Sequence, residues 1–375
     1  MAVGERLLGI RGPTLAEILS REKNSFGVMR MLLASIVVIS HALMVRAGTM
    51  AADPVVQFTG YSSGQHAVQG FFVLSGLLIA QSFAQSRSLA DFASARFLRI
   101  FPGLILCVLL TSFLLGPLVS TYTPAAYFSS ETLWSYIVLT LALKTGSAPL
   151  PGVFEHVPMA NMVNWSVWTL KFETVCYAFL GLGGAAALAS PWPLQARLAT
   201  AACVAAFLVS KQPQLIEGNS FVDTMRYFTL FFATGVLSYV MRRYIVINGF
   251  VLAVLMALFA NLIGTRFSEA ATAVLLGYGM LWLSTFSFGP LRQFTARHDL
   301  SYGIYIYGVP VTQTLFYVWP DVGIPALIAL TFAIVMPLAA MSWLIIERPA
   351  IRLRPVLAGA LQKRFNQPSA TTHLK

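Results

Sequence analysis

Charged residues are scarce in this chain. Only 10% of its 375 residues are Asp, Glu, Lys or Arg, whereas 57% are hydrophobic, and a soluble domain usually carries about 25% charged residues. That shortage excludes a soluble globule, because too little polar surface would be left to cover a core of this size. Lipid accepts apolar side chains on the outside but requires each backbone group to be satisfied within its own segment. The composition therefore predicts a membrane protein built from helices.

Cysteine and acidic residues are also few, and each shortage removes a class of function. Cys107, Cys176 and Cys203 all lie within apolar stretches, which favours small buried residues over a disulfide framework, and no metal site is expected. The 25 Lys and Arg residues outnumber 14 Asp and Glu, for a net charge of +11. Because these residues fall between apolar runs and not in one patch, we interpret them as topology signals and expect no nucleic-acid partner.

Long apolar runs predict the topology. A crossing needs about 20 residues, and ten such runs can be read in the sequence, near 26–46, 66–86, 96–119, 168–189, 194–210, 222–241, 244–263, 268–287, 300–318 and 324–346. An eleventh run, Leu133 to Leu143, is too short, and the basic loops place its two flanks on the same face. We therefore predict an all-α integral membrane protein with about ten transmembrane helices plus a short re-entrant or interfacial segment, and with both termini in the cytoplasm.

This topology divides the chain into three parts. Residues 1–23 are predicted to be a cytoplasmic N-terminal segment, residues 24–350 the transmembrane domain, and residues 351–375 a cytoplasmic basic tail. An ionisable residue inside a span is costly unless it is paired or hydrated, so each one marks a candidate functional site.

The first span holds two such residues, Arg30 and His41. Eleven residues are close to three helical turns, so both side chains project from one face about 16 Å apart. Arg30 lies toward the cytoplasm and His41 toward the outside. A snorkelling interfacial arginine is the alternative for Arg30, and a histidine held by a neighbouring helix without chemistry is the alternative for His41.

Two arginines begin the third span, and a carboxylate enters the fourth. Arg96 and Arg99 share a helix face, where their guanidinium groups suit a phosphate, although paired arginines at an inner boundary are also ordinary topology signals. Glu173 and Tyr177 lie four residues apart on one face. A surface pair of Glu173 with Lys171 is disfavoured, because residues two apart on a helix do not face each other.

Further polar and aromatic side chains are candidates for substrate contacts. Ser75 carries a hydroxyl within an apolar helix, but Ser75-Gly76 indicates a close helix contact equally well. Trp165 and Trp168 can stack on a sugar ring, although anchoring at the membrane interface is favoured.

Taken in order, the motifs resemble the membrane-bound acyltransferase 3 family, bacterial O-acyltransferases that modify polysaccharides, lipopolysaccharide, peptidoglycan and Nod factors. The resemblance covers residues from about 26 to 350. The resemblance rests on these motifs: the Arg30 to His41 spacing, Phe71-Phe72-Val73-Leu74-Ser75-Gly76, Arg96-x-x-Arg99, Trp168-Thr169-Leu170-x-x-Glu173-x-x-x-Tyr177, Ser301-Tyr302-Gly303-Ile304-Tyr305-Ile306-Tyr307 and Glu347-x-Pro349.

The resemblance implies an enzyme of the bacterial inner membrane. It would transfer an acyl group, usually acetyl from cytoplasmic acetyl-CoA, to a hydroxyl of a cell-surface or exported glycan. The family's essential residues correspond to Arg30, His41, Arg96, Arg99 and Glu173.

We therefore hypothesise that the arginines hold the phosphates of CoA. His41 would take the acceptor's proton, and Glu173 would orient its imidazole or stabilise the charged form of that ring. Tyr177 and Tyr305 are further candidates for substrate contact. The competing class is a transporter or flippase of a lipid-linked sugar.

Overall fold

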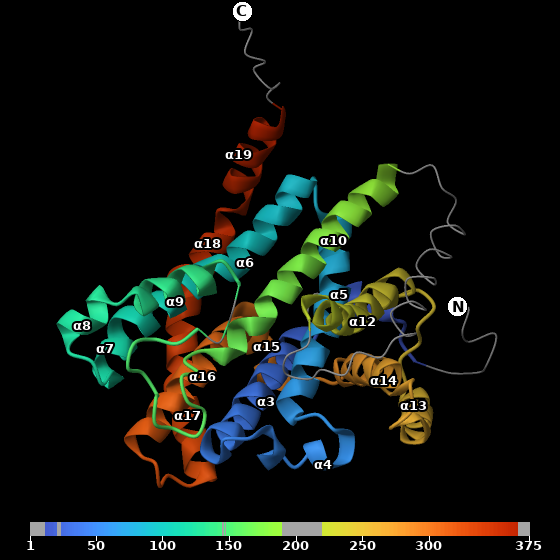
Figure 1. Ribbon diagram of the computed structural model, residues 1–375. Coiled ribbons are helices and arrows are strands. Elements are labelled where there is room, and N and C mark those ends of the chain that lie inside the picture. The colour runs from blue at the N-terminus through green and yellow to red at the C-terminus, as the bar shows by residue number, and fades with distance from the viewer. Residues whose placement is uncertain (1–11, 21–23, 145, 147, 190–219, 367–375) are drawn as a thin grey trace, which may run out of the picture.

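The computed structural model describes residues 12–20, 24–144, 146, 148–189 and 220–366. Within these residues the chain is helical, and its only bridge between extended segments pairs Thr14 with Val246. Figure 1 shows the helices gathered around α3 and α16, with α10 and α19 rising from the bundle. The prediction of an all-helical architecture is thereby confirmed for the described part.

Nine of the ten predicted spans coincide with helices, while 194–210 lies outside the described residues. The observed bounds are α3 Phe26–Ala47, α5 Ser63–Gln85, α6 Leu89–Leu110, α10 Leu170–Ala189, α12 Phe221–Val240, α13 Gly249–Leu262, α14 Ser268–Leu283, α16 Ser301–Val318 and α17 Ile324–Ser342. Shorter elements connect them: α2 Leu15–Ser20, η1 Met50–Ala52, α4 Val56–Thr59, α7 Gly116–Val119, α8 Pro124–Ser129, α9 Glu131–Leu141, η3 Trp165–Thr169, α15 Gly289–Arg297, α18 Arg348–Arg352 and α19 Arg354–Asn366.

Four helical stretches of the described chain are long and apolar enough to cross a membrane: Phe26–Ala47, Ser63–Gln85, Leu89–Val119 and Ile324–Arg352. They establish a membrane protein but not the predicted number of spans. Helix α13, with 14 residues, is about 21 Å long and falls short of the hydrocarbon thickness of about 30 Å. Helix α9, with 11 residues, is shorter still, in keeping with a segment that does not cross.

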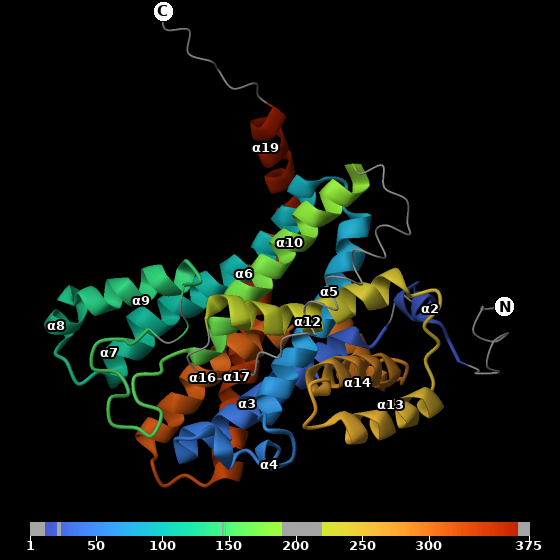
Figure 2. The same cartoon turned by 45° about the vertical axis from the view of Figure 1, so that its right-hand side comes forward.

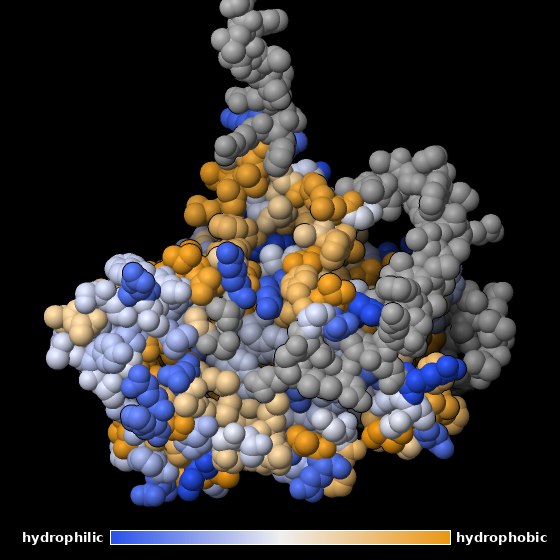
Figure 3. All heavy atoms as spheres, viewed as in Figure 1, coloured by the Kyte–Doolittle hydropathy of each residue, from blue (hydrophilic) through white to orange (hydrophobic). Residues whose placement is uncertain are grey.

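Large apolar side chains remain exposed on the outer surface of the helices. Leu118 is 77% exposed, Phe250 70% and Phe179 65%, and Figure 3 shows hydrophobic residues gathered around the base of α19, with smaller patches lower on the visible face. A soluble protein rarely leaves such surface open to water. The exposed apolar surface fits a chain that faces lipid.

Two of the long spans contain a wider, π-type turn. Helix α6 continues through η2 (Thr111–Leu115) into α7, and α17 continues through η4 (Trp343–Glu347) into α18. Such turns insert an extra residue and often occur at functional sites. The second of them turns Glu347 into the protein, where it is only 1% exposed.

Helices α5 and α12 approach each other closely through two glycines. A methyl group on Gly76 would lie 2.0 Å from the carbonyl oxygen of Phe232, and one on Gly235 would lie 2.0 Å from that of Val73. Only a residue without a side chain fits at either position. The close contact expected of Ser75-Gly76 is therefore present, and it leaves the Ser75 hydroxyl free to point elsewhere.

The N-terminal segment packs against the same bundle. Backbone N–H groups of Leu15 and Ala16 donate to the carbonyl oxygens of Ile245 and Arg242 at 2.9 and 2.8 Å. Figure 2 shows α2 beside the end of α12, with α13 and α14 lying side by side below it.

Candidate functional site

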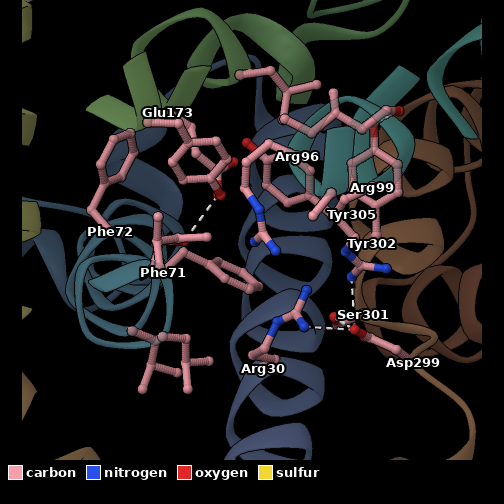
Figure 4. Close-up of a pocket in the computed structure, with 18 of the residues that line it drawn as sticks. Arg30, Phe71, Phe72, Arg96, Arg99, Glu173, Asp299, Ser301, Tyr302 and Tyr305 are labelled. Atoms are coloured by element: carbon pink, nitrogen blue, oxygen red, sulfur yellow. Dashed lines mark hydrogen bonds and ion pairs between the residues drawn. The ribbon is translucent and has the colours of Figure 1, made fainter. Parts of the chain in front are cut away.

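A cavity of about 300 Å³ opens among α3, α5, α6, α10 and α16. It brings together seven residues that the sequence singled out, and Figure 4 shows several of them pointing into the same space. These residues are Arg30, Ser75, Arg96, Arg99, Glu173, Tyr177 and Tyr305. Apolar side chains of α5, among them Phe71, Phe72 and Leu78, form one wall.

Arg30 and Arg99 share one carboxylate at the floor of the cavity. Arg30 Nη1 lies 2.5 Å and Arg99 Nη2 lies 2.8 Å from Asp299 Oδ2. The other oxygen of Asp299 accepts a hydrogen bond of 2.6 Å from the Ser301 hydroxyl. Burial alone would raise the pKa of Asp299, but Arg30 and Arg99 outweigh it and hold this pKa well below its usual range.

Arg99 has a second acidic neighbour in Glu347. Their nearest charged atoms are 3.6 Å apart, and Ser342 donates a hydrogen bond of 2.8 Å to the same carboxylate. The guanidinium group also lies over the Tyr302 ring, 5.4 Å from its centre. Arg99 is therefore fixed from three sides, by α16, by the π-type turn of η4 and by the segment that holds Asp299.

Arg96 is less firmly held. Its Nη2 atom donates a long hydrogen bond of 3.3 Å to Ser82, and its buried Nε has no hydrogen-bond partner in the described structure. The guanidinium carbon lies 6.0 Å from the centre of the Tyr177 ring. Arg96 therefore retains donors for an anion that enters the cavity.

Arg354 also lines the cavity, where α19 meets α6. Its Nε and Nη2 donate a double hydrogen bond to Asp91 at 2.7 and 2.8 Å. This fork-shaped pair fixes the basic helix α19 to the start of α6. The predicted basic tail thus contributes a residue to the site.

Glu173 faces the arginine-lined cavity, and its hydrogen-bond partners there are hydroxyl groups. Its Oε1 atom accepts a 2.9 Å hydrogen bond from Ser75 and a short one from Tyr177. The sequence analysis placed Glu173 beside His41, but the structure gives it these two partners. One of these partners, Ser75, lies on α5, and spacing within one helix does not predict such a contact.

His41 lies apart from the cavity lining, on the same helix as Arg30. Its ring centre is 5.8 Å from that of Trp165, at the start of η3. Trp168, at the other end of that turn, packs among Phe172 and Phe228 with ring centres 5.7 Å away in each case. Trp165 therefore contacts the candidate base, whereas Trp168 belongs to an aromatic cluster.

Three members of the site, Asp299, Tyr302 and Arg354, were not predicted as site residues from the sequence, and Glu347 was named only within a family motif. Asp299 lies directly before the Ser301 motif, in a loop where an acidic residue looks solvated. A buried arginine needs an acidic partner. The sequence predicts three arginines at a similar depth of the membrane, and this cluster indicated that acidic partners existed. The sequence did not indicate which ones.

Replacing Asp299 by Asn should destabilise the protein by about 3 kcal/mol, because removal of one partner leaves two partly buried guanidinium groups facing each other. Thermal unfolding of the purified protein in detergent measures this. The lowered pKa of Asp299 keeps it ionised at neutral pH, so its contribution is present above about pH 4 and is lost only as the pH falls through the folded-state pKa. An unfolding temperature equal to that of the wild type would contradict the assignment.

Two comparisons with known proteins give matches for this chain. The sequence profile of the acyltransferase domain family, acyltransferase 3, matches residues 23–346. An O-acetyl transferase of Shigella phage Sf6 is 28% identical over 332 residues, covering 87% of this chain and 96% of the relative. Nodulation protein 10 of Rhizobium leguminosarum bv. viciae is 28% identical over 373 residues, covering 90% and 96%. No solved structure gives a significant match.

Proposed function

The chain belongs to the acyltransferase 3 family and is a membrane O-acyltransferase, and on that premise we propose that it transfers an acyl group from cytoplasmic acyl-CoA to a glycan. The acyl group would be acetyl, the acceptor a hydroxyl of a cell-surface or exported glycan, and the membrane the bacterial inner membrane. The observation that carries the proposal is the arginine-lined cavity beside the helix that bears His41.

The cavity suits a donor that is anionic at one end and apolar at the other. Arg96 offers unused donors, and Arg30 and Arg99 each use only part of their five N–H groups on Asp299. Guanidinium groups are well matched to phosphate oxygens. The phosphates of CoA would bind to these arginines, and the apolar wall of α5 would follow the pantetheine arm.

His41 is the group proposed to move the proton. Its neutral imidazole would take the proton of the acceptor hydroxyl while the hydroxyl oxygen attacks the thioester carbonyl. The carbon–sulfur bond then breaks and CoA leaves as its thiolate, which takes up a proton. A route through an acetyl-histidine uses the same residue as nucleophile.

Glu173 acquires a different proposed role from its contacts. With Ser75 and Tyr177 as hydrogen-bond donors and Arg96 nearby, its carboxylate would set the shape and charge of the donor cavity.

A transporter or flippase of a lipid-linked sugar would also need many helices and buried charges. Labelled acetyl-CoA supplied to membranes that contain the protein separates the two functions. Label that reaches a glycan supports transfer, whereas unlabelled glycan with altered sugar export supports transport. Mass measurement of surface polysaccharide from cells with and without the gene then identifies the acceptor and the acyl group.

Arg96→Met should raise KM for acyl-CoA about tenfold or more and change kcat much less, because a hydrogen-bonded charge on a phosphate contributes mainly to binding. Steady-state kinetics with varied acyl-CoA measure this. Arg243→Met is the matched control, since Arg243 is exposed and lies outside the cavity. Equal KM values for the wild type and the Arg96 variant would remove Arg96 from the donor site.

A further inference from the structure

Helix α16 contains a proline that frees a backbone carbonyl. Pro310 lies within the helix, and because proline has no N–H, the carbonyl of Ile306 four residues earlier loses its helical donor. Almost every residue of α16 is buried, so water is a poor substitute and the oxygen needs a partner from the protein.

Asn164 supplies that partner, and the Cys107 thiol, 3.3 Å from the same oxygen, is a second donor. Its side chain is fully buried, and its Nδ2 donates a 3.0 Å hydrogen bond to the Ile306 oxygen. The Asn164 Oδ1 atom accepts a 2.9 Å bond from the Ser166 hydroxyl, which lies 3.0 Å from the Tyr305 carbonyl oxygen as well. The residues on both sides of Trp165 are thus fixed to α16.

The same turn also reaches the donor cavity. The Tyr305 hydroxyl donates a 2.5 Å bond to the Ser166 carbonyl and lies 2.6 Å from the Thr169 hydroxyl. Thr169 and Tyr305 both line the cavity. One short segment, residues 164–169, therefore contacts His41 through Trp165 and forms a cavity wall at its other end.

We propose that Asn164 is a positioning residue, which uses the carbonyl freed by Pro310 to hold Trp165 against His41 and so fixes the proposed base relative to the donor cavity. This inference rests on the proposed function for its effect on catalysis. The hydrogen bond of Asn164 and the ring contact of His41 are independent of it.

Asn164→Ala should lower kcat about tenfold and leave KM for acyl-CoA within about twofold, because misplacement of a reacting group affects the chemical step more than donor binding. Asn261→Ala is the matched control, since Asn261 is exposed on α13. A kcat equal to that of the wild type overturns the proposal.

Fluorescence tests the positioning directly, because a protonated imidazole in contact with an indole quenches its emission. The pH-dependent quenching of Trp165, taken as the difference between the wild type and Trp165→Phe, should vanish in His41→Ala. In Asn164→Ala it should fall at least threefold. Full quenching in Asn164→Ala overturns the proposal whatever the activity, whereas an active His41→Ala enzyme overturns only the assignment of His41 as the base.

Pro310→Ala provides a second route if Asn164→Ala does not fold. The new N–H can bond the Ile306 carbonyl within the helix and compete there with the Asn164 side chain, so the quenching should again fall. The double variant should be no worse than the more impaired single one, because both changes remove the same contact. Undiminished quenching in Pro310→Ala would show that the freed carbonyl does not hold the turn.

Discussion

His41→Ala should lower kcat by about 10³-fold while the protein stays folded and still binds acyl-CoA. General-base catalysis contributes roughly 10²- to 10⁴-fold, and the described structure offers no second histidine next to Trp165. Donor binding should persist because the arginines and Glu173 line a cavity that His41 does not line. Transfer of labelled acetyl to the acceptor, measured with purified protein, gives kcat.

Two further variants make this result specific. His156→Ala changes an exposed histidine of the loop that precedes η3, and it should behave as the wild type. His41→Gln keeps a polar side chain of similar reach but cannot take a proton, so it should be as inactive as His41→Ala. If His41→Gln transferred acetyl at the wild-type rate, the histidine would be structural and the base would have to be sought elsewhere.

The helices were the part of the fold that hydropathy could predict. Nine apolar runs match helices to within a few residues at most ends, because lipid leaves a chain few other ways to satisfy its backbone. The number of crossings was not predictable in the same way. Helix α13 is apolar along its length yet has only 14 residues, and the predicted run 244–263 overstated its length chiefly by including residues 244–248, which precede the helix.

Hydropathy also could not predict how the elements meet. Spacing alone placed Arg30 and His41 on one face of α3, and one continuous helix carries both. One hydrogen-bond partner of Glu173 is Ser75, which lies 98 residues earlier in the sequence. Pairwise spacing rules apply within a helix and carry no information about such a contact.

The arginines show the same limit for charged groups, because sequence spacing does not predict their partners. Arg96 and Arg99 are adjacent on their helix face, but the structure gives them different surroundings. Arg99 has two acidic neighbours, whereas Arg96 has a single long hydrogen bond to Ser82. The sequence motif does not distinguish Arg96 from Arg99. The geometry separates an arginine held by two carboxylates from one that keeps an unused donor.

Gly235→Val should prevent folding, which is the largest structural effect expected of a single change in this protein. Even a methyl group at this position would lie 2.0 Å from a backbone oxygen of α5, and a backbone atom cannot move aside as a side-chain tip can. The cost should exceed the roughly 3 kcal/mol that overpacking usually reaches. The yield of monodisperse protein after size-exclusion chromatography in detergent measures it.

Gly183→Val is the matched control, because a side chain at Gly183 in α10 would meet nothing within 4 Å. It should give wild-type yield, since valine in a lipid-facing helix adds no clash. Gly76→Val should fail as Gly235→Val does, because the two glycines form one contact from opposite sides. A normal yield of Gly235→Val would mean that α5 and α12 pack further apart, and Ser75 would then be released from the wall where it bonds Glu173.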